Sequence, residues 1–472
     1  MEWRLNLEKV ATATSGNIYN VDKDEIVKDV LTDSRIITEG SVFVALKGEN
    51  TDGHRYVKQA LNDGAVCAIV SDNNLAEEGL PVIVVEDTLA ALRNIASLYR
   101  NEFNIPCVGV TGSVGKTSTR DMIHYVLSES YDVHKTEKNY NNEIGLPLTI
   151  FGLKSEHDMM VLEMGMSGFG EISRLTEIAR PDTAVITNIG LAHIEKLGSQ
   201  VNILKAKLEI IEGLSPDGAV ILNGDDPYLR SLEGTLPFET LYFGIESKNC
   251  DITAENIKKY SGGTDFTVKI DGEEYDVSIN VPGTHHVYNA LAALLAGIRY
   301  NIPVKKIVAG IGKFVTSGMR QNIIKLNDYT IIKDCYNASP QSMQSGLEVL
   351  ESTYSDKRDK KYLRVAVLGD MLELGDIAKA EHEKIGKLLL KYDIDRLITV
   401  GEMAAHIGES AIEEGFLASD VFSFYDNESV INNIYSIIKP DDIILFKGSR
   451  GMKLEEIADY LIKTNGRKTD KQ

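Results

Sequence analysis

Cysteine is scarce in this 472-residue sequence, and long apolar runs are absent from it. The four cysteines lie far apart and none belongs to a Cys-x-x-Cys pair, so the pattern predicts neither a disulfide framework nor a zinc site. No segment reaches the roughly 18 uninterrupted apolar residues of a membrane-spanning helix, and the N-terminal stretch lacks the apolar core of a secretory signal. We therefore expect a cytoplasmic protein without stable membrane insertion.

Basic residues are in deficit, because 50 Lys and Arg face 70 Asp and Glu and leave a formal charge of −20. A surface of this sign repels phosphate backbones, so we do not expect nucleic-acid binding. An anionic substrate would need a focused positive site. With 43% hydrophobic and 25% charged residues the composition is that of a folded protein, and the length predicts about three domains.

Short apolar runs alternate with helical patterns along the chain. Runs such as CVGV, MMVLEM and TAVITNI show no polar alternation, which favours a parallel sheet covered on both faces. A more polar, strand-like insertion at about 241–281 precedes an apolar helix at 287–298. We predict an α/β fold with three domains: a small α/β N-terminal domain at 1–103, a central parallel-sheet domain at 104–317 and a C-terminal Rossmann-like domain at 318–472.

The strongest local signal is TGSVGKTS, between an apolar run and a helical pattern. Glycines allow successive backbone N–H groups to face one anion, a lysine reaches the terminal phosphates, and a threonine hydroxyl binds Mg²⁺. The match is to a short GxxGKT form, since Val110 stands where the eight-residue pattern requires glycine. An ordinary strand-to-helix turn is the alternative. We predict a P-loop ATPase domain in which ATP contacts Thr111, Gly112, Ser113, Val114, Gly115, Lys116, Thr117 and Ser118.

Two other apolar runs end in candidate metal ligands. Glu163 closes MMVLEM, and His193 follows TAVITNI. The carboxyl ends of parallel strands open on one crevice, so both side chains could reach the phosphates. A solvated or helix-capping glutamate and a packed histidine are the alternatives. Lys205 and Lys207 lie on a helical pattern that either faces the same crevice or is solvated.

Eight motifs, in this order and spacing, resemble the Mur ligase family, the ATP-dependent amide-forming enzymes of peptidoglycan synthesis. They are GVTGSVGKTS, LEMGMSGFGEI, TNIGLAHIE, KAKLEI, LNGDDP, PGTHHVYNALAA, GMRQ and DCYNASP. The opening TDSRIITEGSVFVALKGENTDGHRYV resembles the UDP-binding domain of members that act late in the series, and KTEKNYNNEIGLPLTIFGL and VLGDMLELG resemble the last member. The Asp-Asn-Pro-Arg motif of the preceding ligase is absent.

The resemblance implies a reaction. D-Ala-D-Ala would be added to the tripeptide carboxylate of UDP-N-acetylmuramoyl-tripeptide through an acyl phosphate, with ATP converted to ADP and phosphate. It implies that the N-terminal domain binds the UDP substrate and that the C-terminal domain closes on the nucleotide and binds the dipeptide. A monomer is the family expectation.

The resemblance also implies residue roles. Lys207 matches a lysine that family members carbamylate, which turns a cation into an anionic oxygen ligand of the kind that Mg²⁺ prefers; Lys205 is the alternative if the register differs by two. Two Mg²⁺ ions would be held by Thr117, Glu163, His193 and carbamylated Lys207. The implied catalytic residues are Lys116, His193, Lys207 and Arg320.

Further contacts follow from the same resemblance. His285 and Asn289 occupy an HxxxN pattern near adenine, and Arg320 and Asp334 would reach the ribose and phosphates from the third domain. Without the resemblance, the histidine pattern is an ordinary helix start. The candidate substrate contacts are Ser34, Arg35, Asn141, Asn142, Tyr336 and Asn337.

Two other features and three other functions remain open. We predict that His382 lies on the surface of an amphipathic helix and that the turn at 448–451 forms a small anion site. A ligase adding a single amino acid, of the muramyl-peptide or folylpolyglutamate type, would share the loop and metal ligands. A P-loop GTPase or kinase is disfavoured because Asn-Lys-x-Asp is absent. A nucleotide-binding scaffold without catalysis is the third alternative.

Overall fold

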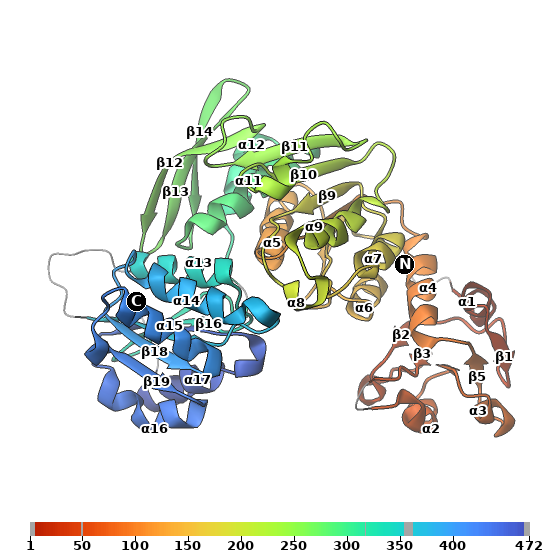
Figure 1. Cartoon of the computed structure of the whole chain (residues 1–472). Coiled ribbons are helices and arrows are strands. Elements are labelled where there is room, and N and C mark those ends of the chain that lie inside the picture. Colours follow the sequence, from red (N-terminus) through yellow and green to blue (C-terminus); the bar gives the residue numbers. More distant parts are fainter. Residues whose placement is uncertain (1–4, 49–50, 317, 354–361, 467–472) are drawn as a thin grey trace. The chain divides into compact units, whose positions relative to one another are not determined.

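The computed structural model describes residues 5–48, 51–316, 318–353 and 362–466 (Figure 1). It contains sheets of five, nine and six strands, which confirms the predicted α/β class. The chain divides into two compact units, one made of 1–111, 130–185 and 206–220 and the other of 112–129, 186–205 and 221–472. The predicted boundary at residue 317 lies outside the described residues. Within those residues no helix combines the length and apolar character needed to cross a membrane.

The five-stranded sheet is formed by the N-terminal part of the chain. Four of its strands are parallel, and β1 pairs antiparallel at one edge. Strands β3 and β4 are buried at every residue, which explains why their sequences show no polar alternation. In sheet order the strands are β1 (Asn17–Tyr19), β5 (Val82–Val84), β4 (Cys67–Val70), β3 (Ser41–Val44) and β2 (Asp29–Leu31), with helices α1 (Leu7–Thr14), α2 (Val57–Asn62), α3 (Asn74–Glu77) and α4 (Thr88–Arg100).

The nine-stranded sheet carries the phosphate loop. Its parallel strands β6 and β8 are neighbours, with Val110 opposite Glu163, so the end of β6 and this glutamate share one edge of the sheet. The polar insertion forms the antiparallel strands β12, β13 and β14. In sheet order the strands are β14 (Glu273–Ile279), β13 (Gly263–Ile270), β12 (Ile252–Tyr260), β11 (Glu239–Gly244), β10 (Ala219–Asn223), β9 (Thr183–Ile186), β6 (Cys107–Thr111), β8 (Met159–Glu163) and β7 (Val133–Lys135).

Helices alternate with the strands along this part of the chain. The apolar segment predicted at 287–298 lies inside α11. The helices are α5 (Lys116–Leu127), α6 (Gly145–Phe151), α7 (Glu171–Ala179), α8 (Ile194–Leu197), α9 (Gln200–Leu208), α10 (Pro227–Arg230), α11 (Thr284–Arg299) and α12 (Val304–Gly312).

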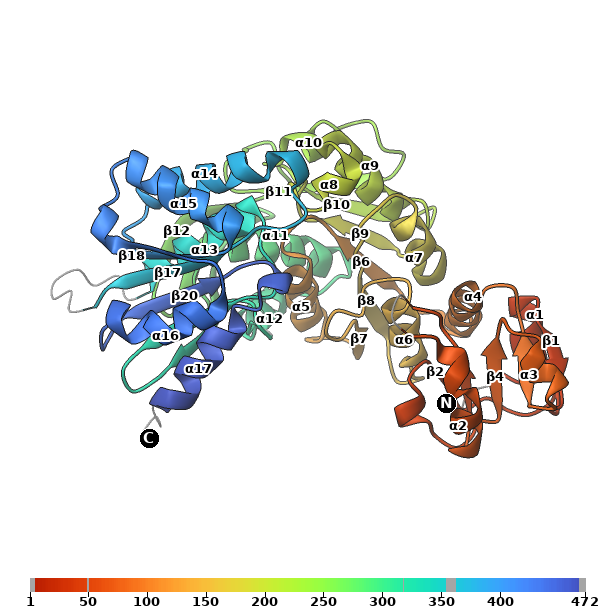
Figure 2. The same ribbon diagram turned by 60° about the horizontal axis from the view of Figure 1, so that its bottom comes forward.

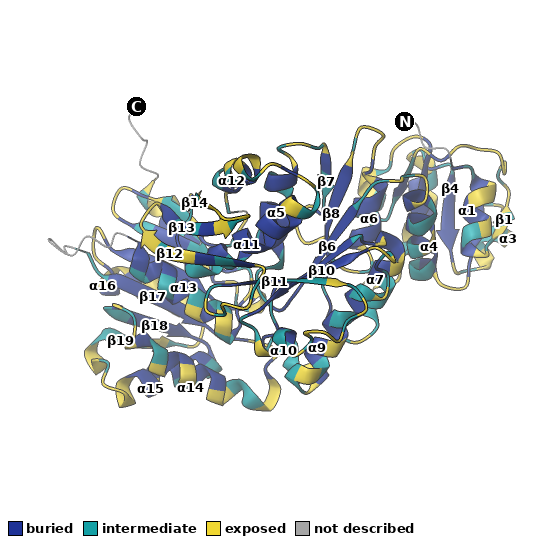
Figure 3. Ribbon diagram, turned by 90° about the horizontal axis from the view of Figure 1, so that it is seen from above, coloured by how far each residue is buried: buried dark blue, intermediate teal, exposed yellow. Residues whose placement is uncertain are grey.

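The six-stranded sheet is covered by helices on both faces, α14 and α15 on one and α16 and α17 on the other (Figure 2). Strands β17 and β20 are buried at every residue, and Figure 3 shows β17 in the colour of buried residues. In sheet order the strands are β15 (Asn322–Lys325), β16 (Thr330–Asp334), β20 (Ile443–Lys447), β17 (Arg364–Gly369), β18 (Arg396–Val400) and β19 (Val421–Phe424), with helices α13 (Pro340–Ser352), α14 (Ala378–Leu389), α15 (Glu402–Glu413), α16 (Asn427–Ile437) and α17 (Glu455–Asn465).

The strand order of this sheet creates a switch point between β17 and β20. Chain connections leave these two neighbouring strands toward opposite faces, and ligands of doubly wound sheets bind beyond the carboxyl ends of such strands. Asp370 follows β17, and its carbonyl accepts a hydrogen bond from the backbone N–H of Ser449, which follows β20. The turn at 448–451 therefore lies at the switch point.

Candidate active site

The phosphate loop joins β6 to α5, and its glycines are required by its shape. Gly115 caps α5 with φ of +88°, a left-handed conformation that favours glycine. Gly112 has φ of +147°, and a Cβ atom there would collide with Thr187. The Nζ of Lys116 donates to the carbonyl of Gly112 at 2.8 Å, which holds the ammonium group over the loop. The loop thus presents a lysine and a helix N-terminus, a combination that suits an anion.

The segment after β9 holds this loop in place. Asn188 accepts hydrogen bonds from the backbone N–H of Ser113 through its carbonyl at 3.0 Å and from that of Val114 through Oδ1 at 2.9 Å. The Oγ1 of Thr187 donates to the carbonyl of Val114 at 2.6 Å. The Oγ of Ser113 accepts from the N–H of Gly190 at 2.8 Å. No role was predicted for Thr187, although it lies at the end of the apolar run TAVI, which was a usable signal.

A buried polar chain leads from α5 through α11 to residue 321. Thr119 donates to Oδ1 of Asn289 at 3.0 Å, and the Nδ2 of Asn289 lies 3.4 Å from Nδ1 of His286. The Oε1 of Gln321 accepts a hydrogen bond from each of two neighbouring imidazoles. It lies 3.0 Å from Nε2 of His285 and 2.8 Å from Nε2 of His286. The predicted pair His285 and Asn289 is therefore linked through His286 and Gln321, neither of which was predicted.

Burial keeps both imidazoles neutral. Desolvation lowers the pKa of His285 to about 4 and that of His286 well below its ordinary value. Because the unfolded chain would bind a proton near pH 6.5, the folded state loses stability as pH falls from about 6.5 toward 4. Both rings donate through Nε2–H to one acceptor, so protonation adds a charge without adding a partner.

We expect the variant His285→Gln to reduce this acid sensitivity. At pH 5 the depressed pKa of His285 corresponds to a loss of about 2 kcal/mol relative to neutral pH. Thermal unfolding at pH 7.5 and pH 5 measures the effect: the wild-type transition should fall by a few degrees more than that of the variant. Equal shifts in the two proteins would show that His285 does not contribute to acid sensitivity.

The predicted nucleotide contacts Asp334 and Arg320 each contact another side chain of the C-terminal part of the chain. Asp334 is 6% exposed, and its Oδ2 lies 2.7 Å from Nζ of Lys447, which is 2% exposed. Its Oδ1 accepts from the backbone N–H of Gln321 at 3.3 Å. The guanidinium of Arg320 lies over the ring of Tyr336, 4.0 Å from its centroid. Lys447 was not predicted; the lysine that follows the apolar run DIILF was the available signal.

Glu163 is almost fully buried at the end of β8. Its backbone N–H donates to Thr136 Oγ1 at 3.0 Å, and its Oε1 accepts from Nδ2 of Asn141 at 2.7 Å. The predicted metal ligand and a predicted substrate contact are therefore in direct contact. The Oδ1 of Asn142 instead accepts from the N–H of Gly145, the first residue of α6, at 2.8 Å.

The two lysines of α9 differ in burial. Lys207 is 1% exposed, whereas Lys205 is an exposed residue. The following Glu209 has a structural role, because its carboxylate accepts from the backbone N–H groups of Gly170 at 2.7 Å and Ser173 at 3.2 Å at the start of α7. Burial distinguishes Lys207 as the candidate of this helix.

The remaining metal candidates are Thr117 and His193. Thr117 is 5% exposed in the first turn of α5. His193 has φ of +65°, and its Nδ1 lies 2.6 Å from Oε2 of Glu373. Judged by donor type alone, the hydroxyl, carboxylate and imidazole of the predicted ligands suit a hard cation such as Mg²⁺.

The candidates for the UDP group lie in a short turn of the N-terminal part. Asp33 caps the 3₁₀ helix Ser34–Ile36 by accepting from the N–H of Arg35 at 3.0 Å. The exposed guanidinium of Arg35 lies 2.7 Å from the same carboxylate and lowers the pKa of Asp33 to about 2. Arg35 therefore presents an accessible guanidinium beside a fixed turn.

The prediction that His382 lies on the surface is wrong. It is fully buried, because α14 turns this residue toward the sheet. Its Nε2 accepts from the N–H of Met371 at 2.9 Å, its Nδ1 donates to the carbonyl of Ala378 at 2.7 Å, and burial lowers its pKa. In the predicted anion turn, Ser449 Oγ accepts from the N–H of Leu372 at 2.9 Å.

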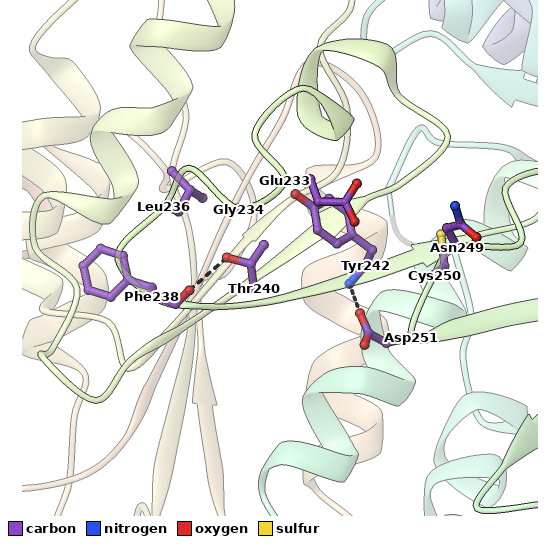
Figure 4. Close-up of a pocket in the computed structure, with 9 residues that line it drawn as sticks. All are labelled: Glu233, Gly234, Leu236, Phe238, Thr240, Tyr242, Asn249, Cys250 and Asp251. Carbon is purple, nitrogen blue, oxygen red and sulfur yellow. Dashed lines mark hydrogen bonds between the residues drawn. The ribbon is translucent and has the colours of Figure 1, made fainter.

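A cavity of about 510 Å³ lies along β11 and the segments just before and after this strand (Figure 4). Two residues hold Tyr242 in the lining of this cavity. Asp251 accepts from the backbone N–H of Tyr242 at 2.6 Å, and the guanidinium of Arg230 lies over the Tyr242 ring. None of the predicted site residues belongs to its lining, which consists of Glu233, Gly234, Leu236, Phe238, Thr240, Tyr242, Asn249, Cys250 and Asp251.

Comparisons with known proteins cover nearly the whole chain. Residues 27–100 match the Mur ligase family catalytic domain, 110–297 the Mur ligase middle domain, and 319–450 the Mur ligase glutamate ligase domain. The UDP-N-acetylmuramoyl-tripeptide--D-alanyl-D-alanine ligase of Bacillus subtilis is 40% identical over 97% of this chain and 98% of its own.

Solved structures agree with these matches. A MurF crystal structure from Acinetobacter baumannii has a TM-score of 0.87 at 30% identity and covers 97% of this chain and 98% of its own. MurF ligase from Thermotoga maritima, solved in complex with ADP, has a TM-score of 0.80 at 28% identity and covers 92% and 97%. With three successive domains matched and a full-length relative at 40% identity, the chain belongs to the Mur ligase family.

Proposed function

We propose that this chain joins D-Ala-D-Ala to the tripeptide carboxylate of UDP-N-acetylmuramoyl-tripeptide at the expense of ATP. The supporting observation is the full-length likeness, at 40% identity, to a ligase named for these substrates. The alternative, a ligase that adds a single amino acid, is not favoured, because the relatives from Bacillus subtilis, Synechocystis and Escherichia coli all carry this same name. The phosphate loop, with Lys116 held against the carbonyl of Gly112, supports ATP as the energy source.

The chemistry follows from the poor reactivity of a carboxylate. Its charge is delocalised, and its leaving group would be oxide. In the proposed reaction the carboxylate oxygen attacks the γ-phosphorus of ATP, the bond to the β,γ-bridging oxygen breaks, and ADP leaves. The amine of D-Ala-D-Ala then attacks the acyl carbon, loses a proton, and inorganic phosphate departs as the amide forms.

Lys116 and the loop N–H groups would bind the β and γ phosphates, and Arg320 would add a second cation on the transferring group. The residues proposed to hold two Mg²⁺ ions are Thr117, Glu163, His193 and carbamylated Lys207. When bound, Mg²⁺ neutralises phosphate charge and orients the phosphates. No nucleophilic side chain is required.

Carbamylation would solve the problem of a buried lysine near metal ions. The neutral amine of Lys207 attacks CO₂, a carbon–nitrogen bond forms, one proton leaves, and the product is an anionic carbamate. The 1% exposure of Lys207 supports this assignment, because a buried ammonium beside Mg²⁺ would be repelled. The exposed Lys205 offers no comparable site.

Substrate binding would be divided along the chain. Residues 1–103 would bind the UDP group through Ser34 and Arg35, and 104–317 would bind ATP. Residues 318–472 would close on the nucleotide and take the incoming dipeptide, a division supported by the position of the turn at 448–451 at a switch point. His285, Asn289 and Asp334 would serve the nucleotide, and Asn141, Asn142, Tyr336 and Asn337 the substrate.

The proposed setting is the bacterial cytoplasm, with the chain acting as a monomer. Its four cysteines are free, as expected where thiols stay reduced.

Phosphate release tests the function directly. The full chain should release phosphate from ATP only when UDP-N-acetylmuramoyl-tripeptide and D-Ala-D-Ala are both present, and the product should be heavier by one dipeptide unit. Parallel reactions contain single amino acids, or dihydrofolate with glutamate. Turnover only with a single amino acid would identify the protein as a related ligase that adds one amino acid. Nucleotide binding without turnover would favour a nucleotide-binding scaffold without catalysis.

A further inference from the structure

The loop between β17 and α14 carries the motif MLELG, which the proposed reaction does not use. The loop is anchored at its base by two side chains. The N–H of Met371 donates to Nε2 of the buried His382 at 2.9 Å, and the N–H of Leu372 donates to Oγ of Ser449 at 2.9 Å. These anchors explain why α14 buries a histidine.

The tip of the loop presents Glu373 to a candidate metal ligand. Oε2 of Glu373 lies 2.6 Å from Nδ1 of His193. A second contact is made by the backbone, because the carbonyl of Glu373 accepts from the N–H of Glu195 at 3.2 Å. Glu373 and His193 both have left-handed backbones, with φ of +63° and +65°. Such conformations are disfavoured for residues other than glycine and persist where the surroundings hold them.

Stability is a weak reason for this contact. The side chain of Glu373 is 50% exposed, and half-exposed ion pairs contribute little to folding. Geometry offers a stronger reason. A carboxylate oxygen held 2.6 Å from Nδ1 limits rotation of the imidazole and leaves Nε2 as the nitrogen away from this contact, and carboxylates beside Nδ1 commonly orient metal-binding histidines.

We propose that Glu373 is a positioning residue that orients His193 for Mg²⁺ binding through Nε2. The inference rests on the proposed role of His193 as a metal ligand. Ser449 anchors the same loop through Leu372, the residue before Glu373. The turn proposed to bind the dipeptide is therefore connected to His193 through two adjacent loop residues.

Manganese provides a readout that does not depend on turnover. The full chain is mixed with a non-hydrolysable ATP analogue and with Mn²⁺ in place of Mg²⁺. Electron paramagnetic resonance measures the bound Mn²⁺ in a titration. Pulsed spectra then record the nitrogen-14 modulation that a coordinated imidazole produces. His193→Ala identifies the source of that modulation. The matched control is Asp376→Ala, which removes an exposed carboxylate three residues further along.

We expect Glu373→Ala to weaken Mn²⁺ binding about tenfold and to reduce the nitrogen modulation. Glu373→Gln keeps a side-chain oxygen of the same reach beside Nδ1 and should restore most of both signals, and Asp376→Ala should match the wild type. Wild-type modulation and affinity retained in Glu373→Ala would overturn this inference alone. Absence of nitrogen modulation from the wild type would overturn the metal role of His193 and this inference with it.

Discussion

Replacement of Lys116 by alanine is expected to lower kcat by about 10³-fold. The ammonium group is held over the loop by the carbonyl of Gly112 at 2.8 Å, where it would face the transferring phosphoryl group. Charge on that group is redistributed in the transition state, so a preorganised cation lowers the barrier. The measurement is substrate-dependent phosphate release at saturating ATP, which separates kcat from KM.

The controls separate this effect from unfolding. Lys154 is exposed, and Lys154→Ala should retain wild-type kcat. Lys116→Met keeps the aliphatic stem without the charge and should be as inactive as the alanine variant, with an unchanged thermal transition. A kcat within tenfold of the wild type in either Lys116 variant would contradict the proposed role.

Replacement of Lys207 by alanine is expected to lower kcat by about 10²- to 10³-fold, because an anionic ligand is lost from a site that concentrates charge. Lys205→Ala is the matched control two residues away on the same helix and should stay within about twofold of the wild type. Phosphate release in the presence of both substrates measures each variant.

Chemical rescue tests the carbamate itself. Lys207 is 1% exposed, so its truncation leaves an enclosed space that a short carboxylate can enter. Acetate or propionate should restore part of the activity, whereas acetamide, which has the shape of acetate without its charge, should not. In the wild type, labelled bicarbonate should produce a carbamate signal in carbon-13 spectra. Full activity of Lys207→Ala without any added carboxylate would show that the reaction does not need a carbamate on Lys207.

Much of the fold could be predicted because its signals are local. Runs such as MMVLEM are apolar without alternation, since both faces of β8 are covered. The position of the phosphate loop was also readable, because glycine, lysine and threonine at fixed spacing act through the backbone of one short segment. The resemblance then extended these local signals to distant motifs.

The burial of residues on helices could not be predicted from the sequence, because it depends on which face of the helix packs against the rest of the protein. Lys205 and Lys207 are about 200° apart around α9, so one must face away when the other is buried, and the sequence does not say which. The same limit made the prediction for His382 wrong, because an imidazole flanked by two glutamates is equally compatible with a solvated or a buried face.

By itself the sequence determined the α/β class, the phosphate loop and the family, because these depend on period and spacing along the chain. Only the tertiary structure decided the partners that are distant in sequence. Asp334 meets Lys447 across 113 positions, and His286 meets Gln321 across 35. Such pairs form because buried polar groups must find partners wherever the fold places them, and no local pattern encodes that choice.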